Sequence, residues 1–209
     1  MLSPVNRWLL NPAAKPLFFF ASCLPFGWLL YAALNDQLGA NPAEALIRSL
    51  GDWNIRFLLL VLLITPLRTL AGWPALARLR RMCGLFVFFY ATLHLMAYVW
   101  LDQGFVWREV VSDTIKRPFI LVGMLAWAML LLLALTSVNR AIRWLGARRW
   151  QALHRLVYVV AGLAVLHFFW MRSGKNDFEE VVVYAVLFVV LLGWRAIQSL
   201  RRRFSATRT

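Results

Sequence analysis

The chain has 209 residues, of which 62% are hydrophobic, and it carries a formal net charge of +14. Soluble domains are usually no more than about half apolar, so this composition excludes an ordinary soluble protein and indicates one embedded in lipid. The charge does not indicate nucleic-acid binding, because no soluble domain is predicted that would hold a basic groove. We therefore predict an all-α integral membrane protein with a single domain over residues 1–209.

Six segments are long and apolar enough to cross a bilayer. A spanning helix needs about 20 mostly apolar residues, and only helices and closed barrels satisfy every backbone hydrogen bond in hydrocarbon. The predicted helices are Pro16–Leu34, Arg56–Ala71, Met82–Leu101, Pro118–Thr136, Ala152–Met171 and Glu180–Ile197. No small-residue cleavage site is obvious after the first, so we interpret it as a helix and not as a removed signal. Pro66 predicts that the second helix closes or kinks near its end.

Basic residues gather in alternate connections between these helices. The basic regions are the N-terminus, the loops before helices three and five and the C-terminal tail, with Arg7, Lys15, Arg78, Arg80, Arg81, Arg140, Arg143, Arg148, Arg149, Arg201, Arg202, Arg203 and Arg208. The other three connections hold a few basic residues together with Asp36, Glu44, Asp52, Asp102, Glu109, Asp113, Asp177 and Glu179. Because Lys and Arg are enriched in cytoplasmic loops, we predict a multi-pass protein of the bacterial inner membrane with both termini in the cytoplasm.

The three histidines of the chain are His94, His154 and His167, and all of them fall within predicted helices three and five. Ionisable side chains at membrane depth are costly and usually serve a function. For any one of them alone, a neutral imidazole bonded to a neighbouring helix is an equally good interpretation. Three together, with no histidine elsewhere, favour a functional role.

The spacing of the histidines favours haem over a zinc ion. His154 and His167 are thirteen residues apart, or about 20 Å along a helix axis, which is too far for one zinc ion but suits haems stacked in a four-helix core. Helices three and five run in the same direction, and His94 follows Arg81 by the same thirteen residues. His94 and His167 are therefore predicted at one level, as the axial pair of one b-type haem between helices three and five.

His154 has no histidine partner at its own level, where helix three carries Arg80 and Arg81. Three interpretations stay open: a second haem with a weaker or different sixth ligand, no haem at this level, or a quinone or flavin site. The two arginines are topology signals in the simplest interpretation, although a haem propionate would interact with either.

Several motifs resemble the haem-binding membrane subunit of the bacterial protein-methionine-sulfoxide reductase system, the MsrQ or YedZ family. They are ATLHLMAY around His94, RRMCGL before it, LLLVLLITPLR in helix two and RRWQALHRLVYVVAGLAVLHFFW across helix five. The resemblance covers nearly the whole chain. The wider resemblance is to ferric-reductase-like transmembrane domains, which usually carry four histidines, two on each of two helices. This chain lacks one of the four, which leaves a second haem open.

The resemblance implies a non-catalytic electron-transfer subunit of an oxidoreductase complex. It implies one haem b or two, and FMN, with electrons arriving from the quinone pool or a cytoplasmic flavin reductase. They would pass to a periplasmic molybdopterin-containing reductase that repairs oxidised methionine in envelope proteins. Residue by residue it carries over only to His94, His154 and His167, because we find no flavin motif. The outer loops near Asp102–Lys116 and Arg172–Glu180 are predicted to dock the periplasmic enzyme.

Two other functions compete with this one. A small transporter would use the intramembrane histidines to relay protons, and it would usually show repeated, broken helices, which we do not find. A ferric or superoxide-type reductase with another acceptor would keep the haem. Such an enzyme normally has a cytoplasmic nucleotide- and flavin-binding domain, and because the sequence reaches Thr209 without one, a separate donor polypeptide would be needed.

Overall fold

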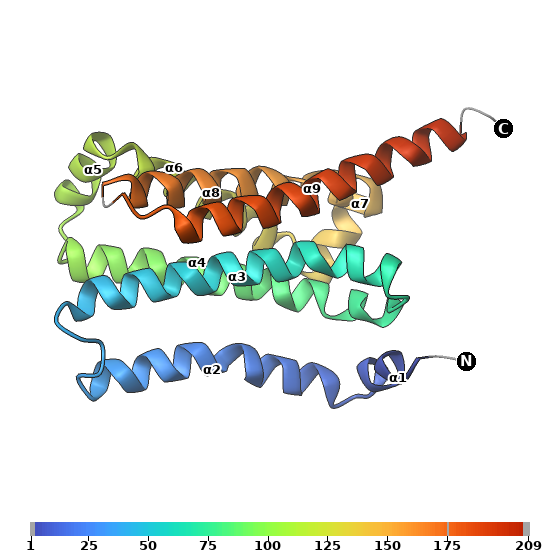
Figure 1. Cartoon of the computed structure of the whole chain (residues 1–209), viewed down its shortest axis with the longest axis horizontal. Coiled ribbons are helices and arrows are strands. Elements are labelled where there is room, and N and C mark those ends of the chain that lie inside the picture. Colours follow the sequence, from blue (N-terminus) through green and yellow to red (C-terminus); the bar gives the residue numbers. More distant parts are fainter. Residues whose placement is uncertain (1–2, 175, 207–209) are drawn as a thin grey trace.

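The computed structural model describes residues 3–174 and 176–206, which fold almost entirely into helices (Figure 1). Six helices in these ranges are long and apolar enough to cross a membrane, which confirms the predicted number. They are α2 (Ala14–Leu34), α3 (Pro42–Leu70), α4 (Arg80–Ala97) with the π-helical turn η2 (Tyr98–Asp102), α6 (Pro118–Leu135), α8 (Leu156–Ser173) and α9 (Glu179–Ala206). Shorter helices are α1 (Pro4–Leu10), the 3-10 helix η1 (Pro74–Arg78), α5 (Trp107–Lys116) and α7 (Asn139–Leu153).

The predicted start of the second spanning helix is wrong, whereas its predicted end at Ala71 lies one residue from the observed end at Leu70. Helix α3 begins at Pro42 and not at Arg56, because Asn41 caps it and Pro42 occupies the first turn. The side chain of Asn41 accepts a hydrogen bond from the backbone N–H of Glu44 at 3.2 Å. Glu44 and Asp52, assigned to a loop from the sequence, therefore lie on a helix. Pro66 does not end α3 either, because the helix continues to Leu70.

The placement of His154 inside a membrane helix is also wrong. Helix α7 ends at Leu153 and α8 begins at Leu156, so His154 lies in the turn between them. The backbone there changes to shorter-range hydrogen bonds, from Arg155 N–H to the carbonyl of Ala152 at 3.2 Å and from Tyr158 N–H to the carbonyl of Arg155 at 3.0 Å. This tight turn interrupts the segment that the sequence presents as one continuous apolar helix.

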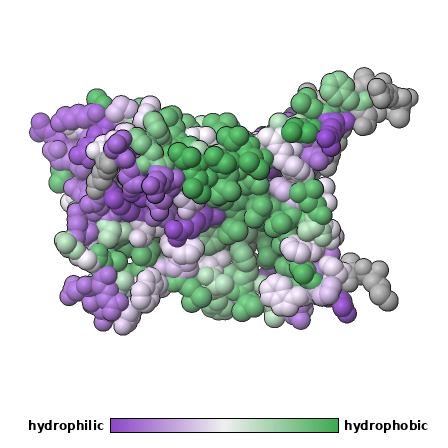
Figure 2. Space-filling model, in the orientation of Figure 1, coloured by the Kyte–Doolittle hydropathy of each residue, from purple (hydrophilic) through white to green (hydrophobic). Residues whose placement is uncertain are grey.

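The chain ends lie together at one end of the helix bundle (Figure 1). We call this the terminal end; it also carries α1, η1 and α7, whereas α5 and the connections α2–α3 and α8–α9 form the distal end. On the face shown in Figure 2, hydrophilic residues gather at the distal end and hydrophobic residues cover the middle. Helix α9 also carries exposed valines, as expected of a helix that faces lipid: Val182, Val183, Val189 and Val190.

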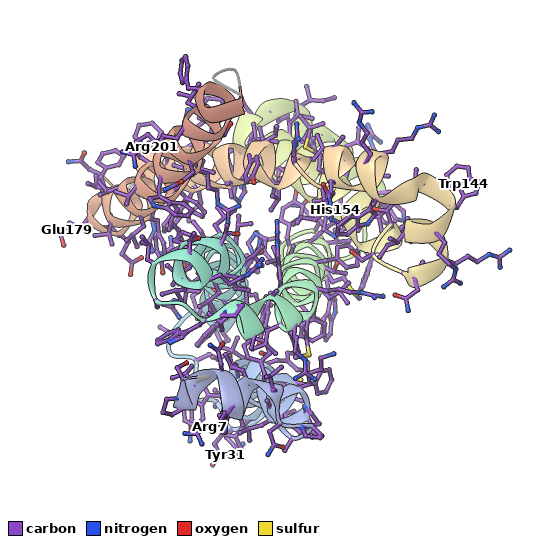
Figure 3. All side chains as sticks on the ribbon, turned by 90° about the vertical axis from the view of Figure 1, so that its right-hand side faces the viewer. Arg7, Tyr31, Trp144, His154, Glu179 and Arg201 are labelled. Carbon is purple, nitrogen blue, oxygen red and sulfur yellow. The ribbon has the colours of Figure 1, made fainter. Side chains whose placement is uncertain are left out.

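A core of four helices, α3, α4, α6 and α8, forms the centre of the molecule, with the closest pairs being α3 with α4 and α6 with α8. Helix α9 packs against α3 and α8, and α2 packs against α3 from outside (Figure 3). This arrangement leaves the interior between the two close pairs as the place for a site.

The side chain of Tyr90 holds α2 against the core. Tyr90 on α4 is fully buried, and its hydroxyl donates to the carbonyl of Ser22 at 2.8 Å and accepts from the N–H of Phe26 at 3.2 Å. Ser22 and Phe26 are four residues apart in α2, so the tyrosine hydroxyl is inserted where a helical hydrogen bond would otherwise form, beside Pro25. The turn of α2 that contains Pro25 is thus the point where this helix is attached to the core.

A buried asparagine attaches α1 to η1 at the terminal end. The Asn6 side chain donates to the carbonyl of Gly72 at 2.9 Å and accepts from the N–H of Ala75 at 3.3 Å. Only 3% of Asn6 is exposed, so water cannot readily replace the Asn6 side chain as the hydrogen-bond partner of these two backbone groups.

We expect Asn6→Ala to lower the free energy of unfolding by about 1–3 kcal/mol, because buried backbone groups lose their partners. The measurement is the thermal denaturation midpoint of the purified protein in detergent. Asn35→Ala is the matched control, since the exposed Asn35 side chain donates only within its own helix, to Tyr31. Equal shifts for the two variants would contradict the role of Asn6.

Candidate functional site

A cavity of about 460 Å³ lies between α3, α4, α6 and α8 and extends from the distal end into the core. Leu58, Leu130 and Val160 line its deep part, and Arg48 and Arg117 line it toward the distal end. Ligand-binding cavities commonly measure about 300–1,000 Å³ and combine apolar walls with a few polar groups. The cavity therefore has the size and the lining of a binding site for a largely apolar molecule.

The two histidines predicted as a pair lie together in this cavity. His94 projects from α4 and His167 from α8, and both line the cavity. Their ring centroids are 6.0 Å apart and their planes are nearly perpendicular, at 88°. The two spans that carry them run in the same direction, so residues at equal distance from the terminal end meet at the same depth.

Each imidazole is held by a backbone carbonyl of the neighbouring helix. The Nδ1 of His94 donates to the carbonyl of Ile47 on α3 at 2.8 Å, and the Nδ1 of His167 donates to the carbonyl of Phe119 on α6 at 2.7 Å. A carbonyl can only accept, so the proton of each neutral ring is on Nδ1 and the lone pair is on Nε2. Metal-binding histidines are commonly oriented by such a hydrogen bond.

Two glycines make room for these rings. A Cβ atom at position 123 would lie 2.9 Å from Nδ1 of His167, and one at position 51 would lie 3.2 Å from Cε1 of His94. Gly51 follows Ile47 by four residues on α3, and Gly123 follows Phe119 by four residues on α6. The pairs α3–α4 and α6–α8 thus use the same arrangement of carbonyl, glycine and imidazole.

The sequence analysis did not identify this arrangement. Gly51 lies before Arg56, where the second helix was predicted to start, so its place beside a histidine of the next helix was not expected. The detectable signal was a similar separation, since the residue whose carbonyl accepts the hydrogen bond precedes its histidine by 47 positions in one pair and by 48 in the other.

The geometry fits a haem held by two axial imidazoles. Histidine nitrogens bind metals at about 2.0–2.1 Å, so a metal between two imidazoles places their centroids about 6 Å apart. The centroid separation of 6.0 Å between His94 and His167 agrees with this requirement. Arg48 and Arg117 would be the cationic residues nearest to haem carboxylates, and each is also paired with an acidic residue, Glu44 and Asp113 respectively.

The structure does not bring His154 to the other two histidines. It lies at the terminal end, where its ring centroid is 4.0 Å from that of Trp150 (Figure 3). The Thr136 hydroxyl donates to the carbonyl of Leu132 and therefore accepts the Nε2–H of His154 at 3.2 Å. Burial, and then the charge of Arg80, lower the pKa of His154, which keeps the ring neutral at pH 7. A ligand role for Nε2 would require this hydrogen bond to break, and the second haem stays a prediction.

Known proteins are similar to this chain in sequence over nearly its whole length. Residues 50–165 match the family described as "Ferric reductase like transmembrane component". A protein of Polaromonas naphthalenivorans is 60% identical over 190 residues, covering 91% of this chain and 87% of its own length. One of Bordetella pertussis is 50% identical over 192 residues, covering 92% and 93%, and one of Herminiimonas arsenicoxydans is 49% identical over 189 residues, covering 90% and 87%. All three are named protein-methionine-sulfoxide reductase heme-binding subunit MsrQ.

The chain belongs to the MsrQ family. Both the specific resemblance and the wider ferric-reductase-like one are thereby confirmed. The ferric-reductase-like match runs from Leu50 to Val165, so it contains Gly51, His94, Gly123 and His154 and ends two residues before His167. In this MsrQ-family chain, the residues that line the cavity therefore lie within residues 50–165, which match the ferric-reductase-like family, or close to them in the sequence.

We expect Gly123→Ala to reduce the haem content of the purified protein about tenfold. The new methyl group would press on a ring that Phe119 holds in place, and overpacking of this kind costs about 1–3 kcal/mol. The measurement is the haem-to-protein ratio from the pyridine haemochrome spectrum. Gly162→Ala is the control, because a Cβ at Gly162 on α8 would meet no atom within 4 Å. Unchanged haem content in Gly123→Ala would contradict the proposed packing.

Proposed function

We propose that the chain is a membrane electron-transfer subunit that binds haem b through His94 and His167. The observation that carries this proposal is the pair of imidazoles in the core cavity, each with Nδ1 bonded to a carbonyl and Nε2 left as the lone-pair nitrogen. The names of the relatives, heme-binding subunits, support the same cofactor. Haem supplies one-electron redox chemistry when it is bound.

The residues of the chain define what kind of haem site this is. If both His94 and His167 hold the haem iron, they would leave no position for oxygen or a substrate, and the chemistry that the haem supplies would be electron transfer. Leu58, Leu130 and Val160 give the deep part of the cavity an apolar lining. The fixed rings need little movement when the charge of the site changes, because Ile47 and Phe119 hold them from the neighbouring helices.

We further propose that the terminal end is cytoplasmic and that the distal end faces the periplasm of a bacterial inner membrane. The arginine-rich connections support this orientation. Electrons would come from the quinone pool or a cytoplasmic flavin reductase, with FMN as an additional cofactor. They would leave at the distal end to a periplasmic molybdopterin-containing methionine-sulfoxide reductase. His154 near the terminal end is the candidate residue for a second haem, a quinone or a flavin on the entry side.

The alternative of a proton-relaying transporter is disfavoured by the hydrogen bonds of the paired histidines. An imidazole relays protons by accepting at one nitrogen and releasing from the other. In both His94 and His167 the Nδ1–H is committed to a backbone carbonyl, which cannot pass the proton on. A haem oxidoreductase with a different acceptor is the second candidate, and it is favoured by the match to ferric-reductase-like proteins over residues 50–165.

We expect His94→Ala and His167→Ala each to remove most of the haem, because each deletes one axial ligand. His154→Ala is expected to have a smaller or separable effect, since His154 lies outside the cavity that holds the pair. Oxidised and reduced absorption spectra with haem quantification test this directly. Full haem retention in both of the first two variants would overturn the ligand assignment, and a colourless wild-type protein expressed with ample haem would overturn the proposed function.

A second prediction concerns the distal surface. Exposed charges on α5, Arg108, Glu109 and Lys116, are well placed to contact a periplasmic partner. Reversing the sign of these charges should slow reoxidation of the reduced protein by its partner several-fold at low ionic strength, with haem content unchanged, because rim charges mainly affect association rates. Arg148→Glu on α7, at the terminal end, is the control. An unchanged rate in the α5 variant would count against docking at this surface.

A further inference from the structure

All acidic side chains of the chain belong to the distal half. The nine residues are Asp36, Glu44, Asp52, Asp102, Glu109, Asp113, Asp177, Glu179 and Glu180, and they lie in or near the α2–α3, α4–α6 and α8–α9 connections. The terminal end carries many arginines but no Asp or Glu. A half-buried arginine at this end therefore has no Asp or Glu side chain of the described residues beside it as a counter-ion.

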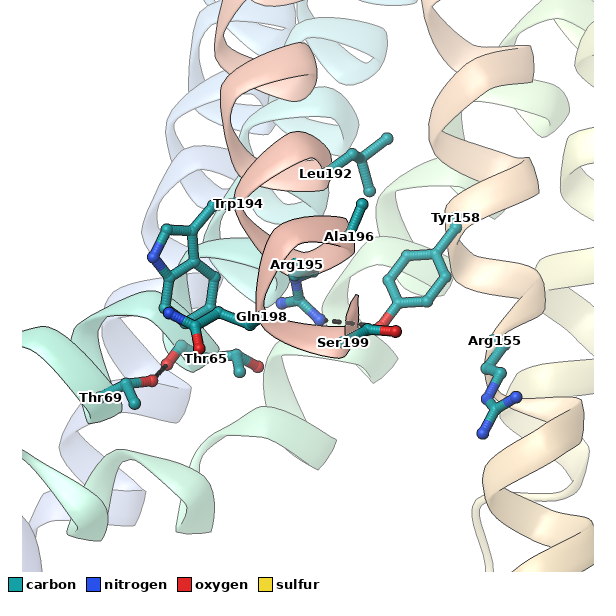
Figure 4. Close-up of a pocket in the computed structure, with 10 residues that line it drawn as sticks. All are labelled: Thr65, Thr69, Arg155, Tyr158, Leu192, Trp194, Arg195, Ala196, Gln198 and Ser199. Carbon is teal, nitrogen blue, oxygen red and sulfur yellow. Dashed lines mark hydrogen bonds between the residues drawn. The ribbon is translucent and has the colours of Figure 1, made fainter. Parts of the chain in front are cut away.

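A second cavity, of about 710 Å³, lies at the terminal end between α3, α8 and α9 (Figure 4). Thr65 projects toward it from α3, Tyr158 from α8 and Arg195 from α9, and Arg155 lines it from the turn that precedes α8. Trp194 and Leu192 add apolar surface to the lining. The cavity thus joins cationic and hydroxyl groups to an apolar wall.

Arg195 is fixed in this cavity by the two neighbouring helices. Its Nη1 donates to the hydroxyl of Tyr158 at 3.0 Å, and its Nη2 donates to the carbonyl of Leu62. That carbonyl is available because Pro66, four residues later in α3, has no N–H to bond to it. The Nε atom of Arg195 is buried and has no hydrogen-bond partner. The guanidinium is therefore held in position with part of its bonding capacity unused.

No carboxylate compensates this charge within the described ranges, since their four ion pairs involve Arg48, Arg117 and Arg172 only. The nearby charges are of the same sign: Arg155 lines the same cavity, and Arg80 is close enough to Arg195 to repel it. The Thr65 hydroxyl is buried and also lacks a partner. A half-buried arginine without a carboxylate partner is costly in a membrane-spanning helix, so these groups call for an anion with several acceptor oxygens.

We propose that this cavity binds a phosphate group, with Arg195 and Arg155 as its cationic partners. Arginine binds phosphate through parallel N–H···O bonds, and basic pockets between membrane helices on the cytoplasmic side bind phospholipid headgroups. The side chain of Leu192, on the side of α9 that faces Tyr158 (Figure 4), gives an apolar surface that suits the rest of an amphiphilic ligand. The phosphate belongs either to an anionic phospholipid or to a soluble phosphate ester, and the same chemistry serves both.

Native mass spectrometry of the full chain tests the proposal. The protein is released from nanodiscs that contain phosphatidylglycerol, or phosphatidylcholine alone, and each is also titrated with inorganic phosphate and glycerol 3-phosphate. We expect one tightly held phosphate-bearing molecule in the wild type. Arg195→Gln and Arg155→Gln should each weaken its retention about tenfold or more, because a charged hydrogen bond is lost. Arg148→Gln, which removes an exposed arginine at the same end, should change nothing.

The outcomes separate the two sources of phosphate. Retention of phosphatidylglycerol that the soluble probes do not displace identifies a lipid, whereas binding of glycerol 3-phosphate or inorganic phosphate identifies a soluble ligand. Equal retention of every probe by the wild type and both glutamine variants would overturn the proposal, as would equal losses in the Arg148 control. Circular dichroism melting checks folding. If Arg195→Gln does not fold, the test uses Arg155→Gln and Tyr158→Phe, which removes one of the hydrogen bonds that hold the Arg195 guanidinium. Weaker retention of the phosphate-bearing molecule in these two variants supports the proposal, and unchanged retention in both overturns it.

Discussion

The hydrogen bonds from two imidazoles to backbone carbonyls of neighbouring helices determine what the centre of this bundle can do. The carbonyls of Ile47 and Phe119 each point along a helix toward the residue four positions later, and a carbonyl has a second lone pair for another donor. A side chain that reaches this lone pair must pass over that later residue. Glycine at positions 51 and 123 leaves the space, and an imidazole then lies directly against the helix backbone. The carbonyl, the glycine and the histidine therefore function as one unit.

This unit occurs twice, once between α3 and α4 and once between α6 and α8. Because each histidine is bonded to its own partner helix, the separation of the two rings is set by how α4 packs against α6 and α8, and not by side-chain flexibility. The protonated Nδ1 atoms are committed, so both rings present a neutral nitrogen without a change of tautomer. A site built in this way is organised before any ligand binds, which suits a centre that gains and loses electrons.

The sequence was sufficient for what depends on hydrophobic length and spacing. The number of spans follows from apolar runs, and the meeting of His94 with His167 follows from two co-directional helices with equal intervals. The sequence was insufficient for placing helix ends where polar residues belong to a helix. Asn41, Glu44 and Arg48 resemble a loop in composition, yet a side-chain cap and an ion pair four residues apart, at 2.6 Å, make them the first turns of α3. The break at His154 was hidden for the opposite reason, because the residues around it are apolar enough to continue a helix.

Helix α3 is longer than predicted, and its length lets it contribute to a site at each end of the molecule. At 29 residues the helix is about 43 Å long, more than the hydrocarbon core of about 30 Å, so it contributes to the molecule at both ends. Ile47 and Gly51 on its distal half hold His94, whereas Leu62 and Thr65 on its other half face Arg195. Pro66 would weaken an isolated helix by removing a hydrogen bond. Here the freed carbonyl of Leu62 accepts from an arginine of α9, so the defect in one helix fixes the position of a charge on another.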